Sequence, residues 1–247
     1  MKTILSLILL SLIAYETTAC DKCKLLKDSP DFKIKSAMVK HNRSLGLLEF
    51  TIEVEGTAGR TTPKAAGKLD GAPVLGYVFP TTLKPQDVGF NDTEGIVALA
   101  LTSHPDFDDS PLWDENSDGT YNNDGLTWHP HWVVLVKDQR VNGGLAVKEF
   151  SKGDTTVKLP PTAPDMPMYM DSPGFPVVTD GKNIRVTVPV YRVNNNTNFK
   201  FDAVTCYMEV SAPDSGHNVG MKMPMLGVYN VFSVLSKDLS LPFTVKN

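Results

Sequence analysis

The sequence predicts an all-β fold: an antiparallel β-sandwich or barrel-like domain with one long acidic loop. Three observations support this fold class. Apolar and polar residues alternate with period two in many short segments. Proline and glycine, 18 of each, punctuate these segments. No stretch of about 12 residues or more has the apolar spacing of an amphipathic helix. Many short strands separated by turns are typical of sandwiches and barrels.

The N-terminus reads as an export signal. Lys2 supplies a positive charge, residues 4–15 form an apolar core, and Thr17-Thr18-Ala19 ends the segment with small residues. The run is short of the about 20 apolar residues that a membrane span needs. We therefore expect a signal peptide over residues 1–19 and an exported domain over residues 20–247, located in the periplasm, on the outer surface or in the medium.

The first expected element after the signal is a β-hairpin, with strands over 32–40 and 47–55 around a turn at 41–46. Further strands are expected at 74–79, 96–101, 132–136, 145–150, 155–159, 184–193, 199–210 and 228–235. The segment Leu-Pro-Pro-Thr-Ala-Pro at 159–164 is stiff, and it is the best candidate for a boundary between two subdomains.

Composition excludes several classes of protein. Hydrophobic residues make up 41% and charged residues 21% of the chain, as in ordinary soluble domains and unlike disordered chains. The net charge of −4 argues against nucleic acid as a partner. The sequence contains no Walker A, G-x-S-x-G or H-E-x-x-H motif, so no familiar catalytic signature identifies a reaction.

The three cysteines leave two pairings open. Cys20 follows Thr17-Thr18-Ala19, which is similar to a lipobox except that Thr17 stands where leucine is usual, so Cys20 is a candidate for lipidation and membrane anchoring. Cys23 and Cys206 could then form a disulfide across a very long loop. The alternative is a local Cys20–Cys23 bond with Cys206 free.

Charge is distributed unevenly along the chain. The interval between Lys84 and Lys137 contains ten acidic residues, three of the five histidines, and no lysine or arginine. A loop of acidic residues without basic partners repels itself, and bound cations or simple solvation relieve the repulsion. The interval is therefore where we expect metal ions.

One motif in this interval resembles the first half of an EF-hand calcium loop. Calcium prefers six to eight oxygen ligands, which alternate residues on a tight loop can supply. The position that normally holds a bidentate glutamate is Gly125, and a surface turn is the alternative interpretation. The expected calcium ligands are Asp114, Asn116, Asp118, Thr120 and Asp124.

A second motif is Trp128-His129-Pro130-His131-Trp132. Residues two apart on a strand share a face, so both imidazoles project to one side. His104 follows the expected strand at 96–101 and would join them if the two strands pair, with Asp106 or Asp108 supplying an oxygen. Such a set suits Zn, Cu or Fe. The alternative is that these histidines flank aromatic packing and hydrogen bond to the acids.

Methionines alternate in two further segments, Asp165–Met170 and Met221–Met225. Thioethers select Cu(I), but methionine is also an ordinary filler of cores, and packing is the favoured interpretation.

The sequence thus favours an exported β-domain that binds a divalent transition metal through His104, His129 and His131, with the calcium-type loop as a structural brace. One alternative is a metal-dependent hydrolase that uses the same histidines. Another is a cell-surface interaction domain that calcium stabilises.

Overall fold

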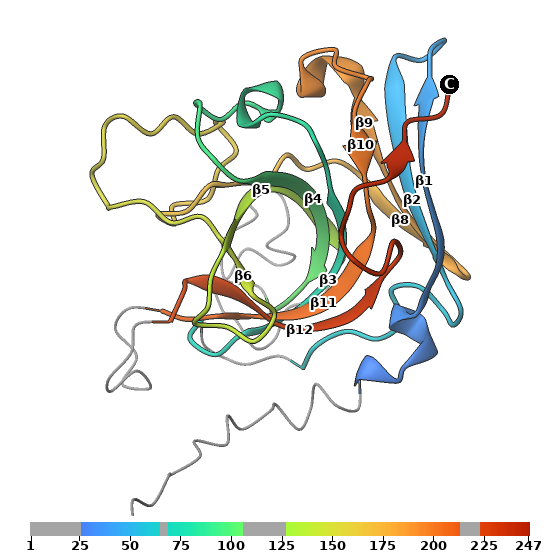
Figure 1. Ribbon diagram of the computed structural model, residues 1–247, viewed down its shortest axis with the longest axis horizontal. Helices are drawn as coiled ribbons and strands as arrows, with labels where there is room; N and C mark the ends of the chain where they lie inside the picture. Colours follow the sequence, from blue (N-terminus) through green and yellow to red (C-terminus); the bar gives the residue numbers. More distant parts are fainter. Residues whose placement is uncertain (1–25, 65–68, 106–126, 213–222) are drawn as a thin grey trace, which may run out of the picture.

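The computed structural model describes residues 26–64, 69–105, 127–212 and 223–247 (Figure 1). Within these ranges the named elements are thirteen β-strands and three short 3-10 helices, and every strand pairing within the sheets is antiparallel. The predicted all-β, antiparallel fold class is confirmed. No helix in the described ranges is long and apolar enough to cross a membrane.

Six strands close into a barrel, which Figure 1 shows end-on as a ring. The order around the ring is β4, β3, β11, β12, β6 and β5, and the pairing of β4 with β5 closes it. The bounds are β3 Pro73–Pro80, β4 Ile96–Ser103, β5 His129–Lys137, β6 Leu145–Val147, β11 Val204–Val210 and β12 Leu226–Val234. The short strand β7 (Met170–Asp171) also pairs with β5, at Trp132 and Val133.

A four-stranded sheet flanks the barrel, in the order β1, β2, β9, β8. The bounds are β1 Ile34–Asn42, β2 Leu47–Val54, β8 Val177–Asp180 and β9 Asn183–Pro189. The predicted first hairpin is confirmed as β1 and β2. Alternate residues of β2 are buried, as expected for a sheet with one face on the core and one in solvent.

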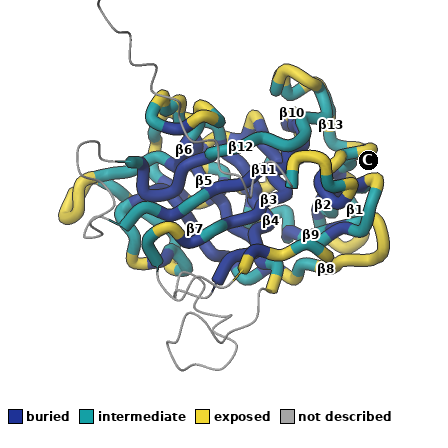
Figure 2. The backbone as a smooth tube through the Cα atoms, turned by 90° about the horizontal axis from the view of Figure 1, so that it is seen from below, coloured by how far each residue is buried: buried dark blue, intermediate teal, exposed yellow. Residues whose placement is uncertain are grey.

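The molecule has two apolar cores because the barrel strands are buried on both faces (Figure 2). Ala98, Ala100 and other residues of the inner face form the apolar wall of the barrel interior. Val97 and Leu99 belong instead to the outer face, where they cluster with Phe50 and the rest of the flanking sheet. Period-two alternation thus sorts neighbouring residues of one strand between two different cores.

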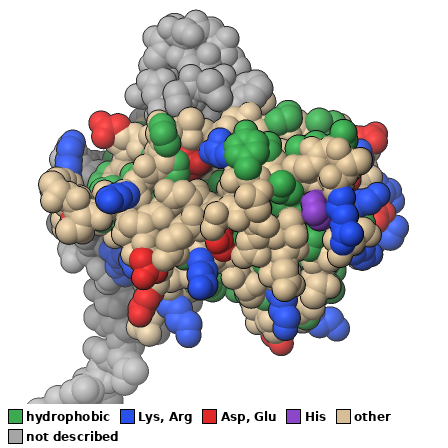
Figure 3. Space-filling model, turned by 90° about the horizontal axis from the view of Figure 1, so that it is seen from above, with side chains coloured by type: hydrophobic (Ala, Val, Ile, Leu, Met, Phe, Trp, Pro, Cys, Tyr) green, Lys and Arg blue, Asp and Glu red, His purple; other side chains and the backbone are tan. Residues whose placement is uncertain are grey.

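Small elements complete the described chain. These are the 3-10 helices η1 (Pro30–Phe32), η2 (Pro85–Val88) and η3 (Val190–Val193), and the strand pair β10 (Lys200–Phe201) and β13 (Phe243–Thr244). On the face shown in Figure 3, hydrophobic side chains form separate groups among charged and polar ones. The exposed large hydrophobic residues in the described part are Leu45, Val178 and Tyr191.

Some strand predictions were wrong. Residues 155–159 form no strand: 155 and 156 lie in a turn, where the Asp154 side chain accepts hydrogen bonds from the backbone and hydroxyl of Thr156, and 157–159 are irregular. The strand expected over 184–193 ends at Pro189, and η3 follows it. The strand expected over 199–210 is broken at Asp202, which accepts a bond from the Ala203 amide. The strands β7, β8 and β13 were not predicted.

Candidate metal centre

Three histidine side chains meet at one end of the barrel, where β4 and β5 pair. His129 lies opposite Thr102, and His131 lies opposite Ala100. His104 follows two residues after Thr102 and so continues the same face of the chain. Local alternation places His129 and His131 together, and the register of β4 against β5 brings His104 to them. The strand pairing that the sequence analysis required is therefore present.

The three rings are close together and buried. The Nε2 atoms of His104 and His129 are 2.7 Å apart. The ring centroid of His129 lies 4.5 Å from that of His104 and 4.8 Å from that of His131. One ring nitrogen from each residue lies within 4.8 Å of the other two. Exposure is 4% for His104, 5% for His129 and 2% for His131, so all three are shielded from bulk water.

The Nδ1 atom of each ring has a hydrogen-bond partner. The Nδ1 atom of His104 is 2.7 Å from the Pro105 carbonyl oxygen, and that of His129 is 2.9 Å from the Thr127 carbonyl oxygen. A carbonyl can only accept, so each of these contacts is a hydrogen bond when the ring carries its proton on Nδ1. Each Nε2 lone pair is then directed away from the backbone. This is the tautomer in which a histidine binds a metal through Nε2.

The third ring, that of His131, is oriented by Ser172, the residue that follows β7. The Nδ1 atom of His131 lies 3.0 Å from Oγ of Ser172. Ser172 follows the fully buried Asp171, which accepts a hydrogen bond from the Thr162 hydroxyl at 2.6 Å. Arg192 lies 3.7 Å from the other carboxylate oxygen of Asp171. Burial raises the pKa of Asp171 despite these two partners. Sequence reasoning missed Ser172, because nothing local to it indicates a histidine partner.

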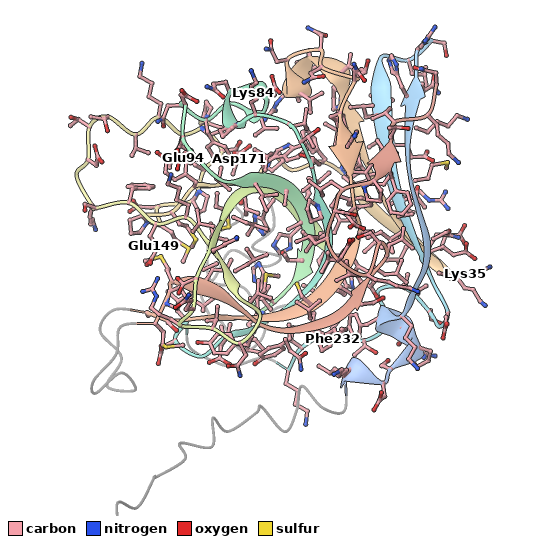
Figure 4. All side chains as sticks on the ribbon, in the orientation of Figure 1. Lys35, Lys84, Glu94, Glu149, Asp171 and Phe232 are labelled. Atoms are coloured by element: carbon pink, nitrogen blue, oxygen red, sulfur yellow. The ribbon has the colours of Figure 1, made fainter. Side chains whose placement is uncertain are left out.

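Two cavities adjoin the histidines. A small one, of about 10 Å³, is lined by His104, His131, Met166, Met168 and Met170, among others. A larger one, of about 120 Å³, occupies the barrel interior and reaches His131. Figure 4 shows side chains that carry nitrogen and sulfur projecting into the ring. None of the described residues that line either cavity is Asp, Glu, Lys or Arg.

The methionines at 166, 168 and 170 were interpreted chiefly as core packing. Met168 and Met170 are indeed buried, at 1% and 2% exposure. All three also line a cavity shared with two histidines, which sequence reasoning could not foresee. The alternating pattern itself was the available signal.

Several predicted site residues lie outside the described ranges. These are Cys20, Cys23, Asp106, Asp108, Asp114, Asn116, Asp118, Thr120 and Asp124. The calcium-type loop, the lipidation and the carboxylate ligands therefore stay predictions. Cys206 is described: its buried thiol lines the larger cavity, and burial raises its pKa to about 12. Its pairing with Cys23 also stays a prediction.

Comparison of the chain with models of protein families, with curated proteins and with solved structures gave no match. The function is therefore argued from the site itself.

Proposed function

We propose that this protein binds a transition-metal ion through the Nε2 atoms of His104, His129 and His131. One observation carries the proposal: three buried imidazoles place one nitrogen each within 4.8 Å of the others. Three histidines form a common ligand set for Zn, and imidazole also suits Cu and Fe. Each Nδ1 atom contacts a carbonyl or hydroxyl oxygen, and such contacts hold metal-binding histidines in a fixed orientation.

Metal binding requires a small adjustment of the rings. Zn–N bonds of about 2.0 to 2.1 Å in a tetrahedral site put two ligand nitrogens about 3.3 Å apart. The Nε2 atoms of His104 and His129 are 2.7 Å apart, so they must separate by about 0.6 Å. His104 lies just beyond the last residue of β4, where the ladder no longer holds the backbone, so the adjustment falls at the strand end.

The setting in the cell belongs to the same proposal. The apolar leader at residues 1–19 supports export, and Cys20 is the candidate anchor to a membrane by a lipid. The acidic segment at residues 114–124 would bind calcium and serve as a structural brace.

Catalysis is the second candidate function, and one observation favours it. His131 lines the 120 Å³ cavity, so one side of the histidine cluster faces a space that a small molecule can fill. A metal with three protein ligands and one open position is typical of hydrolytic centres, where the metal activates a water molecule. Metal-dependent hydrolysis is therefore the activity to screen once metal binding is established.

Elemental analysis tests the proposal. The full chain, expressed with its leader, is purified without chelators and dialysed against metal-free buffer. We expect about one equivalent of Zn, Cu or Fe per chain, as three-histidine centres hold. The double variant His129→Ala/His131→Ala should lose it, whereas His41→Ala, on the flanking sheet, should retain it. Equal metal content in the double variant and the wild type would overturn the proposal.

A further inference from the structure

The barrel interior is a hollow with mostly apolar walls. Its volume is about 120 Å³, and all six barrel strands contribute to its lining. Most lining side chains are valine, leucine, methionine or alanine. Among the described residues that line the hollow, those with polar side chains are Thr102, His131 and Cys206. Because burial raises the pKa of the Cys206 thiol to about 12, this residue is neutral at physiological pH and acts as part of the apolar wall.

The polar groups lie at the histidine end of this hollow. Thr102 pairs with His129 across the β4–β5 ladder and lines the hollow together with His131. The opposite end includes Leu145, which pairs with Lys137 at the far end of β5. The hollow therefore has one polar end and one long apolar body.

Thr102 supplies a polar group, unpartnered within the described residues, at the polar end. The residue is 3% exposed, and its Oγ1 atom has no hydrogen-bond partner among the described residues. A buried hydroxyl without a partner is costly and rare in folded proteins. A molecule in the hollow with one polar atom would satisfy it.

We propose that the barrel hollow binds a small apolar molecule with a single polar atom, which hydrogen bonds to Thr102 Oγ1 beside His131. Binding sites of this type are mostly apolar, with a few placed polar groups. Apolar cavities of about 150 Å³ bind benzene, so a hollow of this size suits a molecule about as large as one aromatic ring. The apolar part of the site does not require the metal of the proposed function, although the ligand's polar atom would lie next to it.

Phenol is a suitable probe, because it has one ring and one hydroxyl. Methyl resonances are followed by NMR while phenol is added to the metal-free protein and to the Co(II)-loaded protein. We expect the largest shifts at Met170, Val133 and Val228, which line the hollow, and none at Met38 on the flanking sheet. Shifts confined to surface methyls, or no shifts, would overturn the proposal.

Two variants test the site more sharply. Thr102→Val keeps the shape but removes the hydroxyl, and it should weaken phenol binding by about fivefold, the effect of one neutral hydrogen bond. Val133→Phe fills the hollow and should abolish binding, whereas Val178→Phe, at an exposed position, should not. Unchanged affinity in a folded Val133→Phe variant would overturn the proposal. If that variant does not fold, the methyl shifts of the wild type decide.

The design separates this proposal from the proposed function. Phenol binding by a protein that takes up no metal would support the hollow alone and overturn the metal site. Metal uptake without phenol binding would overturn the hollow and leave the metal site standing.

Discussion

The Nε2 atoms of His104 and His129 face each other at 2.7 Å, while both Nδ1 atoms donate to backbone carbonyls. In two neutral rings of this tautomer, both Nε2 atoms carry lone pairs, which repel at this distance. A cation between them removes the repulsion. This relationship supports the proposed metal site, because a metal ion bound to both Nε2 atoms would remove the repulsion.

This arrangement predicts the tautomers in the Zn-loaded protein. Both rings should be protonated at Nδ1 and bind through Nε2, because the carbonyls of Pro105 and Thr127 accept only from Nδ1–H. Long-range 1H–15N correlation spectra distinguish the two tautomers. A proton on Nε2 of either ring in the Zn-loaded protein would contradict the prediction.

Ser172 should support metal binding through His131. Its hydroxyl lies 3.0 Å from Nδ1 of that ring, and a hydrogen-bond partner at the nitrogen that does not bind the metal fixes the orientation of the ring. We expect Ser172→Ala to lower the affinity for Zn by about tenfold. Ser172→Thr, which keeps a hydroxyl, should restore most of it, and Ser44→Ala in the β1–β2 turn is the control. Competition with a chromophoric chelator measures the affinity, and equal values for Ser172→Ala and Ser44→Ala would refute the role.

The methionines predict a preference for Cu(I). Met166, Met168 and Met170 line a cavity with two of the histidines, and thioethers are soft ligands. Imidazole nitrogens and thioether sulfurs together form a softer ligand set than three imidazoles alone, which favours Cu⁺ over Zn²⁺.

Replacing all three methionines by leucine should therefore weaken Cu(I) binding by about tenfold or more, as loss of a supporting group does. Zn binding should change little. Competition with bicinchoninate under anaerobic, reducing conditions measures the affinity for Cu(I). The control variant is Met38→Leu. Equal losses for both metals would mean that the methionines only pack the core.

One added methylene should change the free energy of unfolding in opposite directions at two neighbouring valines of β5. Val133 lines the hollow, so Val133→Ile has room and should raise the free energy of unfolding by about 0.8 kcal/mol. Val134 is fully buried in the core between barrel and flanking sheet, so Val134→Ile should lower it by about 1 kcal/mol. Urea denaturation measures both, and a shared sign would show that the hollow does not accommodate the extra group.

The carboxylate of Asp31 makes the stability of the fold depend on pH. Its carboxylate is 1% exposed and accepts hydrogen bonds from the Thr57 amide, the Thr61 hydroxyl and the Arg60 guanidinium. Burial by itself raises the pKa of Asp31, but these partners outweigh it and hold the pKa below its usual range. The charged form therefore stabilises the fold at neutral pH, and this stability is lost as the pH falls through the lowered pKa.

We expect Asp31→Asn to reduce the free energy of unfolding at pH 7 by about 2 kcal/mol, because hydrogen bonds to a charge are lost. The difference from the wild type should shrink as the pH falls below about 4. Urea denaturation at a series of pH values checks this, with the exposed Asp28→Asn as control. A difference independent of pH would contradict the assignment.

Much of the site could be predicted because its strongest feature is local. The side chains of His129 and His131 share a face by strand geometry alone, and the structure bears this out. The position of His104 depends on how β4 and β5 pair. The sequence predicts that His104 joins the other two histidines only if these strands are neighbours. The contact of His131 with Ser172 and its proximity to Met170 follow from the pairing of β5 with β7, a strand too short to show alternation.

The fold shows the same division between local and distant causes. The β1–β2 hairpin was predicted because its two strands are neighbours in sequence. The choice between sandwich and barrel could not be made, because it depends on pairings such as β3 with β11, which lie far apart in the chain. The structure has features of both, a closed barrel with a separate sheet packed on its outer face. The strand expected at 155–159 does not form, because the Asp154 carboxylate accepts hydrogen bonds from Thr156 and so stabilises a turn.

The hollow barrel also determines how the protein responds to hydrostatic pressure. Unfolding eliminates internal voids, and pressure favours whichever state has the smaller volume. A void of 120 Å³ corresponds to about 70 mL per mole of protein, within the range of volume changes that drive pressure unfolding. Moderate compression should therefore loosen the barrel, with its histidines, before it affects the closely packed core beneath the flanking sheet.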